Sequence, residues 1–190
     1  VQSFGRTTSM FAFQTLDLGS YADVVTIGKM SQACACLYTA EMNPKPGLLA
    51  GTFTAATGAF HVGLRVLQRL RDGGYYGPDG RIAKLHAAFR ERAEALVAKH
   101  PEWFPPVRLA FGRTSSRVVG GIGGMMRLTP FGGDKDRINT LLKHLFEDGV
   151  ITLGCDHGPY HLRFLPPIGV FRPEQFDPVF EILERSLARS

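Results

Sequence analysis

Apolar residues recur at helical spacing in four segments of the chain, and these segments predict its main helices. In residues 134–149 the apolar positions fall at i, i+3, i+4, i+7 and i+8, and a glycine stands at position 149, where a left-handed cap ends many helices. The same spacing predicts helices over residues 53–71, 81–99 and 173–188. The apolar positions of the four segments, in chain order, are Phe60, Leu64, Leu67 and Leu70; Ile82, Leu85, Phe89 and Leu96; Ile138, Leu141, Leu142, Leu145 and Phe146; and Phe176, Val179, Phe180, Leu183 and Leu187.

Short runs rich in β-branched and apolar residues lie between turn residues and predict strands. Residues 23–28 (DVVTIG) predict a short buried strand that ends directly before Lys29. Further strands are predicted over residues 37–39, 107–111, 118–128, 150–153 and 160–165. The glycines within residues 118–128 indicate a bulge or close backbone packing rather than a phosphate-binding loop.

The predicted strand over residues 160–165 combines apolar and basic side chains. Successive side chains of a strand point to opposite faces, so Leu162 and Phe164 are expected on one face and His161 and Arg163 on the other. The strand therefore presents an arginine and a histidine away from the predicted core.

The order of these elements predicts an α/β fold in two parts. Residues 1–78 are expected to form the end of a large α/β domain, and residues 79–190 a small α+β domain. The first part is too short to cover both faces of a sheet by itself. Because the chain also begins with Val-Gln rather than Met, we expect it to be part of a longer polypeptide.

Composition and charge narrow the class of protein. The chain has 190 residues, of which 44% are hydrophobic, as in ordinary globular domains, so extended disorder is excluded. No apolar run approaches the ~20 residues that span a bilayer, and no secretory signal sequence is visible. The formal net charge is +5, but acidic and basic residues alternate along the predicted helices, which indicates solvated faces rather than a nucleic-acid interface.

The three cysteines form neither a disulfide framework nor a metal motif. Cys34 and Cys36 are two positions apart, which is too close for a CxxC motif, and the pattern favours a reducing, cytoplasmic location. His157 and His161 lie near Cys155, but a turn divides this segment, and we expect no metal site there.

Three residues are candidates for chemistry by their local setting. Lys29 follows a predicted buried strand, where an ammonium group is costly to keep charged, and a neutral amine can attack an aldehyde; the alternative is a surface lysine just past a strand end. Thr52 precedes a predicted helix, so its hydroxyl either caps that helix or binds a phosphate. Arg163 presents a fork that suits a carboxylate, although a structural salt bridge is equally compatible with the pattern.

Four segments, in order, resemble the class III aminotransferases. They are residues 2–7 (QSFGRT), 23–29 (DVVTIGK), 51–53 (GTF) and 162–167 (LRFLPP). These pyridoxal-phosphate enzymes of fold type I include the ornithine, acetylornithine and 4-aminobutyrate aminotransferases. The resemblance covers the whole chain as the C-terminal portion of such an enzyme.

The resemblance implies roles for four residues. Lys29 corresponds to the lysine that bonds to the aldehyde of pyridoxal 5'-phosphate and then transfers a proton at the substrate α-carbon. Thr52 corresponds to a hydroxyl that binds the cofactor phosphate, in this family from the neighbouring subunit, which implies a homodimer. Gln2 corresponds to a glutamine near the pyridine ring, and Arg163 to the arginine that binds a substrate carboxylate.

The implied function is transamination, from an amine or amino-acid donor to a 2-oxo acid such as 2-oxoglutarate. The family's aspartate partner of the pyridine nitrogen would precede Val1, so this chain alone is expected to be incomplete and inactive without its N-terminal half. An aminomutase or racemase of the same fold is an alternative. A non-catalytic assembly or regulatory module is another, because residues 31–34 (SQAC) replace a glycine-rich stretch of the family.

Overall fold

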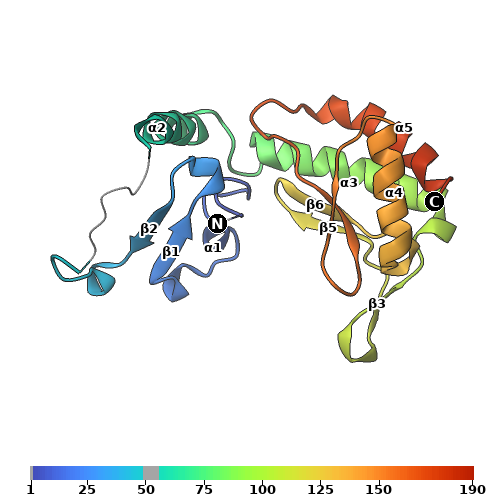
Figure 1. Ribbon diagram of the computed structural model, residues 1–190, viewed down its shortest axis with the longest axis horizontal. Coiled ribbons are helices and arrows are strands. Elements are labelled where there is room, and N and C mark those ends of the chain that lie inside the picture. Colours follow the sequence, from blue (N-terminus) through green and yellow to red (C-terminus); the bar gives the residue numbers. More distant parts are fainter. Residues whose placement is uncertain (1, 49–55) are drawn as a thin grey trace. The chain divides into compact units, whose positions relative to one another are not determined.

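The computed structural model describes residues 2–48 and 56–190, which fold as two compact units, Val1–Ile82 and Ala83–Ser190 (Figure 1). The first unit contains helices α1 (Ala12–Thr15) and α2 (Thr57–Asp72) and strands β1 (Val24–Ile27) and β2 (Ala35–Tyr38). The second unit contains all but the start of α3 (Arg81–Lys99), and it includes α4 (Lys135–Glu147) and α5 (Phe176–Leu187). Its strands are β3 (Val107–Arg108), β4 (Thr114–Ser115), β5 (Val119–Ile122), β6 (Met125–Leu128), β7 (Leu153–Cys155) and β8 (His161–Phe164).

The first unit contains an antiparallel two-stranded ribbon, β1 with β2, and the turn between the two strands (Lys29–Ser31) packs against α2. Its core is small: its buried large apolar residues among those described are Phe4, Ile27, Leu70, Tyr75 and Ile82. An isolated two-stranded ribbon is only marginally stable in water. Helix α2 therefore supplies packing that holds the turn between the two strands in place.

The second unit has one core, formed by three helices and one face of a sheet. Phe89 of α3 lies at its centre, with ring centroids 5.2 Å from Phe164 of β8 and 5.7 and 5.6 Å from Phe176 and Phe180 of α5. Helix α4 begins at Asp134, whose carboxylate accepts hydrogen bonds from two backbone N–H groups of the first turn. As Figure 1 shows, α4 and α5 pack beside each other.

The sheet of the second unit has the strand order β5-β6-β8-β7, with all pairs antiparallel. Met126 and Leu128 of β6 and Leu162 and Phe164 of β8 are buried against the helices. The alternate residues of β6 and β8, among them Arg127 and Arg163, therefore share the opposite face. This polar face of the sheet carries the candidate residue of the second unit, Arg163.

Several sequence predictions are confirmed and others are wrong in detail. The helix over residues 81–99 has the predicted bounds, and Gly149 ends α4 with a φ of +93°. The strand predicted as buried over residues 23–28 is largely exposed, because only Ile27 of β1 is buried and Val24 is 52% exposed. Apolar residues that were expected in helix cores are also exposed: Phe60, Leu64 and Phe146.

Two predicted strands differ from the structure. The strand expected over residues 107–111 ends at Arg108, because Phe111 turns the backbone with a φ of +58°. The strand expected over residues 150–153 begins only at Leu153. Val150 instead belongs to the cap of α4, because its N–H donates to the Leu145 carbonyl. No helix of the described residues is long and apolar enough to cross a membrane.

Candidate functional site

Lys29 stands at the first position of a tight turn, a single 3₁₀ turn (Lys29–Ser31), that follows β1 directly. Its φ is +55°, in the left-handed region, and Gln32 at the other end of the turn has a φ of +60°. Residues other than glycine adopt this region at a cost of roughly 1 kcal/mol or more, and such residues cluster at functional sites. The Lys29 side chain is exposed, and no described residue bonds to its amine.

Three hydrogen bonds and one close backbone contact hold this turn. The Lys29 carbonyl accepts hydrogen bonds from the Gln32 backbone N–H and from Gln32 Nε2, both at 3.0 Å. Ser31 is buried, and its Oγ donates to the Ala33 carbonyl at 2.6 Å. The Cα of Gly63 in α2 lies so close to the Ser31 carbonyl that a Cβ there would overlap it. The position of the Lys29 backbone is thus set by contacts that do not involve its own side chain.

The described residues thus hold the backbone of Lys29 in place but do not bury its side chain. The sequence argument from a buried strand finds no support in these residues, because β1 and Lys29 are mainly exposed. Two other observations support a catalytic role for Lys29: its turn has a strained backbone held by two hydrogen bonds to the Lys29 carbonyl, and no described residue bonds to its amine.

Of the other two candidates in the first unit, one is described. Gln2 is exposed, and the segment that follows it reaches the Lys29 turn: a Cβ on Gly5 would lie 3.1 Å from Met30 Cγ. The structure therefore brings the segment of Gln2 beside the turn of Lys29. Thr52 lies outside the described residues.

Arg163 lies on β8 in the second unit, on the polar face of the sheet. Its side chain is half-buried, and its Nε is fully buried without a hydrogen-bond partner among the described residues. No described carboxylate lies within 4.0 Å of its nitrogens, so the structural salt bridge that the sequence left open is not formed in the described chain. A half-buried guanidinium without an anion is suited to bind one.

Arg127 of β6 is the direct cross-strand neighbour of Arg163. Paired side chains of neighbouring antiparallel strands have Cβ atoms about 5 Å apart, and like charges placed there destabilise the sheet. Sequence reasoning did not single out Arg127. The signal that could have found it is the alternation of Met126, Arg127 and Leu128, which matches the alternation around Arg163.

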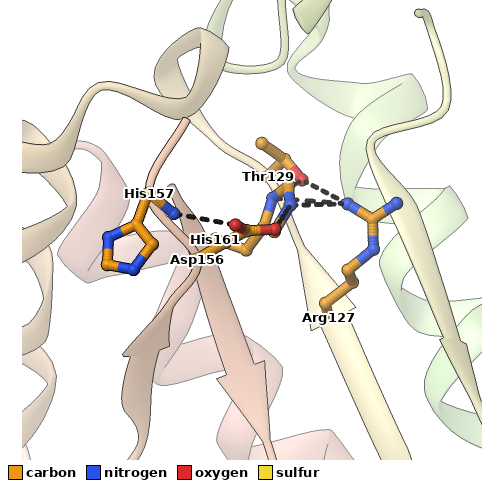
Figure 2. A network of polar contacts seen from close by, with 5 residues as sticks. All are labelled: Arg127, Thr129, Asp156, His157 and His161. Carbon is orange, nitrogen blue, oxygen red and sulfur yellow. Dashed lines mark hydrogen bonds and ion pairs between the residues drawn. The ribbon is translucent and has the colours of Figure 1, made fainter. Parts of the chain in front are cut away.

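His161 connects Arg127 to the rest of the polar face (Figure 2). Arg127 Nη1 lies 3.0 Å from His161 Nε2, and Thr129 Oγ1 lies 2.8 Å from His161 Nδ1. One tautomer satisfies both contacts: Nδ1–H donates to Thr129, and Nε2 accepts from Arg127. Figure 2 also shows Asp156 next to the ring, with Oδ2 3.7 Å from Nε2.

The charges of this cluster act on its titratable groups. Burial lowers the pKa of His161, the Arg127 guanidinium lowers it further, and Asp156 opposes both. Burial raises the pKa of the Cys155 thiol, and the two guanidinium groups of Arg163 and Arg127 partly offset that rise. The positive charges of Arg127 and Arg163 therefore both reach the Cys155 thiol on the polar face. Across residues 2–48 and 56–190, no group of three or more His, Cys, Asp and Glu side chains is placed to hold a metal ion.

No protein-family model matches the chain, and a search of the curated proteins also finds no match. Solved structures do match, over nearly the whole chain. The ornithine aminotransferase of Toxoplasma gondii ME49 superposes with a TM-score of 0.73 and 22% identity, over 98% of this chain and 41% of that one. An aminotransferase of Bacillus anthracis gives a TM-score of 0.74 at 18% identity, over 98% of this chain and 43% of that one. The acetylornithine aminotransferase of Elizabethkingia anophelis gives 0.71 at 21% identity, over 98% and 43%.

The predicted fold is thereby confirmed: the chain has the α/β fold of the C-terminal part of aminotransferases. It spans 41% to 43% of the length of these three aminotransferases. At this level of identity the likeness concerns the fold, and the chemistry is argued from the residues.

Proposed function

We propose that this chain is the C-terminal part of a pyridoxal-phosphate-dependent aminotransferase of class III. Residues 1–78 are then the end of the large cofactor-binding domain and residues 79–190 the small domain. The reaction transfers an amino group from an amine or amino-acid donor to a 2-oxo acid such as 2-oxoglutarate. The observation that carries this proposal is the free amine of Lys29 on its strained, anchored turn, in a fold that matches aminotransferases.

The residues present fit the cofactor in two respects. The Lys29 amine has no partner among the described residues, so it is available to bond to an aldehyde. The Gly63 backbone packs against the Ser31 carbonyl of the same turn, and the Gln32 side chain donates to the Lys29 carbonyl, so the backbone that carries the amine is held in place. Pyridoxal phosphate, when bound, supplies an electron sink for the substrate's α-carbon.

Each of the four candidate residues then has a part in the proposed reaction. Lys29 Nζ would hold the cofactor through its aldehyde and, once released as a free amine, would move the proton at the substrate α-carbon. Thr52 binds the cofactor phosphate through its hydroxyl, Gln2 lies at the pyridine ring, and Arg163 orients the substrate by its carboxylate. Binding and orientation of the cofactor and the substrate are what these residues would contribute to the rate.

The proposed partners follow from exposed apolar side chains of the first unit. Eight of them on its loops and strands are exposed: Leu16, Leu18, Tyr21, Val24, Leu37, Tyr38, Met42 and Leu48. Exposed apolar patches mark interaction surfaces in soluble proteins. We propose that an N-terminal half of the enzyme, a second subunit, or both cover them. Analytical ultracentrifugation of the longest natural polypeptide containing this chain tests for the dimer; a monomer at micromolar concentration would contradict it.

We also propose a cytoplasmic location. Cys34, Cys36 and Cys155 are free thiols in the structure, and free thiols persist in reducing compartments. Fractionation of cells with an antibody to the natural polypeptide tests this, and recovery outside the cytoplasm would contradict it.

Chemical trapping tests the proposed role of Lys29. The longest natural polypeptide containing this chain is incubated with pyridoxal 5'-phosphate, reduced with borohydride and digested, and the labelled peptide is identified by mass spectrometry. We expect the label on Lys29 and its loss in Lys29→Ala. Lys45→Ala is the matched control, because Lys45 is also exposed and lies in the same unit. Labelling spread equally over Lys29 and Lys45 would contradict the proposal, and so would amino transfer at an unchanged rate in Lys29→Ala.

A further inference from the structure

A hairpin arm projects from the second unit, away from its helices and its four-stranded sheet (Figure 1). It consists of β3 and β4 with the residues that join and follow them, and we call residues 107–117 the arm. Val107 is buried at its start and Val118 directly after its end, so both ends are anchored in the unit. The Leu109 N–H donates to the Arg113 carbonyl at 2.7 Å and closes the tip. The arm is thus held at its base while its tip stands out.

The tip of the arm is apolar and exposed. Phe111 has a relative exposure of 101%, so its ring packs on no part of the described chain, and Leu109 beside it is 37% exposed. The φ of Phe111 is +58°, a left-handed conformation that is unfavourable for a bulky side chain and that glycine or asparagine adopts more readily. Neither the backbone nor packing within the chain therefore accounts for an aromatic residue here. Such outliers are retained at functional positions, which directs attention to what lies outside the chain.

Arginines flank this apolar tip on both strands. Arg108 of β3 is paired with Thr114 of β4, Arg113 directly precedes β4, and Arg117 follows it. All three arginines are exposed, and none of them has an ion pair with a described carboxylate. Residues 103–133 contain four arginines and no acidic residue. The arm therefore combines an exposed apolar tip with positive charge that its own surroundings do not balance.

An anionic lipid surface complements this arrangement. Proteins that lie on a membrane bury apolar side chains at the boundary of headgroups and acyl chains, while basic side chains beside them attract anionic lipids. The cytoplasmic leaflet carries a negative surface potential, which agrees with the proposed cytoplasmic location.

Two other kinds of partner fit the arm less well. A protein would need a socket that encloses the whole ring of Phe111, because no side of that ring is covered within the described chain. A single-stranded nucleic acid binds along grooves in which several aromatic rings stack on successive bases, whereas the arm carries one aromatic residue. A lipid surface needs neither a socket nor a groove.

We propose that the arm docks the protein on anionic membranes. Leu109 and Phe111 enter the boundary of headgroups and acyl chains, and Arg108, Arg113 and Arg117 bind the headgroups. The association is peripheral and reversible, because two apolar side chains and three charges bind far less strongly than a helix that spans the bilayer. This inference does not depend on the proposed aminotransferase reaction.

Vesicle co-sedimentation tests the proposal with the longest natural polypeptide that contains this chain. The probes are vesicles of phosphatidylcholine mixed with phosphatidylglycerol, and neutral vesicles of phosphatidylcholine alone. We expect binding to the mixed vesicles that weakens at high salt, and little binding to the neutral ones. Phe111→Ala should weaken binding roughly tenfold or more, because burial of its ring is lost. Arg113→Gln should weaken it about fivefold, through the loss of one charge near an anionic surface.

Two matched controls lie in the same unit outside the arm. Phe146→Ala removes an exposed phenylalanine of α4, and Arg172→Gln removes an exposed arginine and thereby the same charge as Arg113→Gln. Both should leave the affinity for mixed vesicles unchanged. Circular dichroism of each variant ensures that a loss of binding is read only from folded protein.

Fluorescence measures whether the tip enters the lipid. Brominated lipids quench tryptophans that reach the acyl chains, so after subtraction of the wild-type signal they should quench Phe111→Trp and not Phe146→Trp. The proposal is overturned if mixed vesicles are not bound, if Phe111→Ala binds as the wild type does, or if the two tryptophan variants are quenched equally. Emission typical of a buried indole in Phe111→Trp before vesicles are added would show that protein covers the tip, and tighter binding to poly(U) RNA than to mixed vesicles would identify a nucleic-acid partner; either result also overturns it.

Discussion

The Cα of Gly63, in the second turn of α2, lies directly against the carbonyl oxygen of Ser31. This contact joins the helix to the turn that carries Lys29, and no residue with a Cβ can form it without moving the turn. The turn of the candidate catalytic lysine is therefore supported by a backbone contact that is possible only because Gly63 has no side chain.

Gly63→Ala should destabilise the first unit and displace the Lys29 turn. Overpacking of this kind costs about 1–3 kcal/mol in the free energy of unfolding. Urea denaturation followed by circular dichroism measures the cost, and trapping with pyridoxal phosphate should show reduced labelling of Lys29. Gly58→Ala in the same helix is the control, because a Cβ there meets no atom within 4 Å. It should be stable or slightly stabilised, and equal effects of the two substitutions would argue against the contact.

Phe89→Ala should remove the centre of the core of the second unit. Its ring is fully buried and packs on three other phenylalanines, so the loss of its contacts and the resulting cavity should cost about 3–5 kcal/mol. Chemical denaturation gives the value. Phe111→Ala, at a fully exposed position of the same unit, should change the free energy of unfolding by less than about 0.5 kcal/mol. A comparable loss in Phe111→Ala would show that the core is assigned wrongly.

Asp134→Ala should weaken the start of α4. The Asp134 carboxylate accepts hydrogen bonds from the backbone N–H groups of Asp136 at 3.0 Å and Arg137 at 2.9 Å, and loss of such a cap costs about 1 kcal/mol. Thermal unfolding of the variant should show the lower stability. Asp134→Asn keeps an accepting oxygen at the same place and should retain most of the stability. If the two variants are equally destabilised, the cap is not the cause.

Lowering the pH should destabilise the second unit, because His161 has a lowered pKa in the folded state. Burial and Arg127 lower the pKa of His161 from 6.5, so the unfolded chain binds a proton there more readily than the folded one. The contribution of this histidine is fully present above pH 6.5 and is lost as the pH falls from that value towards the lower pKa of the folded state. Unfolding temperatures measured between pH 8 and pH 5 should therefore decline more in the wild type than in His161→Gln.

His157→Gln is the control for this pH dependence, since His157 is exposed and four residues away from His161. It should follow the wild-type decline. If His161→Gln keeps the full decline as well, another group is responsible, and the neutral His161 inferred for the Arg127 network is contradicted.

Local sequence patterns were sufficient to predict elements that depend on residues close in sequence. The helix over residues 81–99 and the cap glycine at position 149 were predicted as observed, because helical spacing and glycine's tolerance of a positive φ are properties of a short segment. The expectation of a buried strand before Lys29 failed for the opposite reason. β-branched residues predict a strand, but whether it is covered depends on what packs against it, and the described residues leave Val24 exposed.

The sequence by itself determined which side chains share a face: the two-residue period of β8 places Arg163 opposite Leu162 and Phe164, and the structure confirms this. Only the tertiary structure decided that Arg127 is the neighbour of Arg163, that His161 holds it, and that Gly63 supports the turn of Lys29. A strand's period is set by its own backbone. Strand register and helix contact are set by packing between segments more than 30 positions apart, and no local pattern encodes that packing.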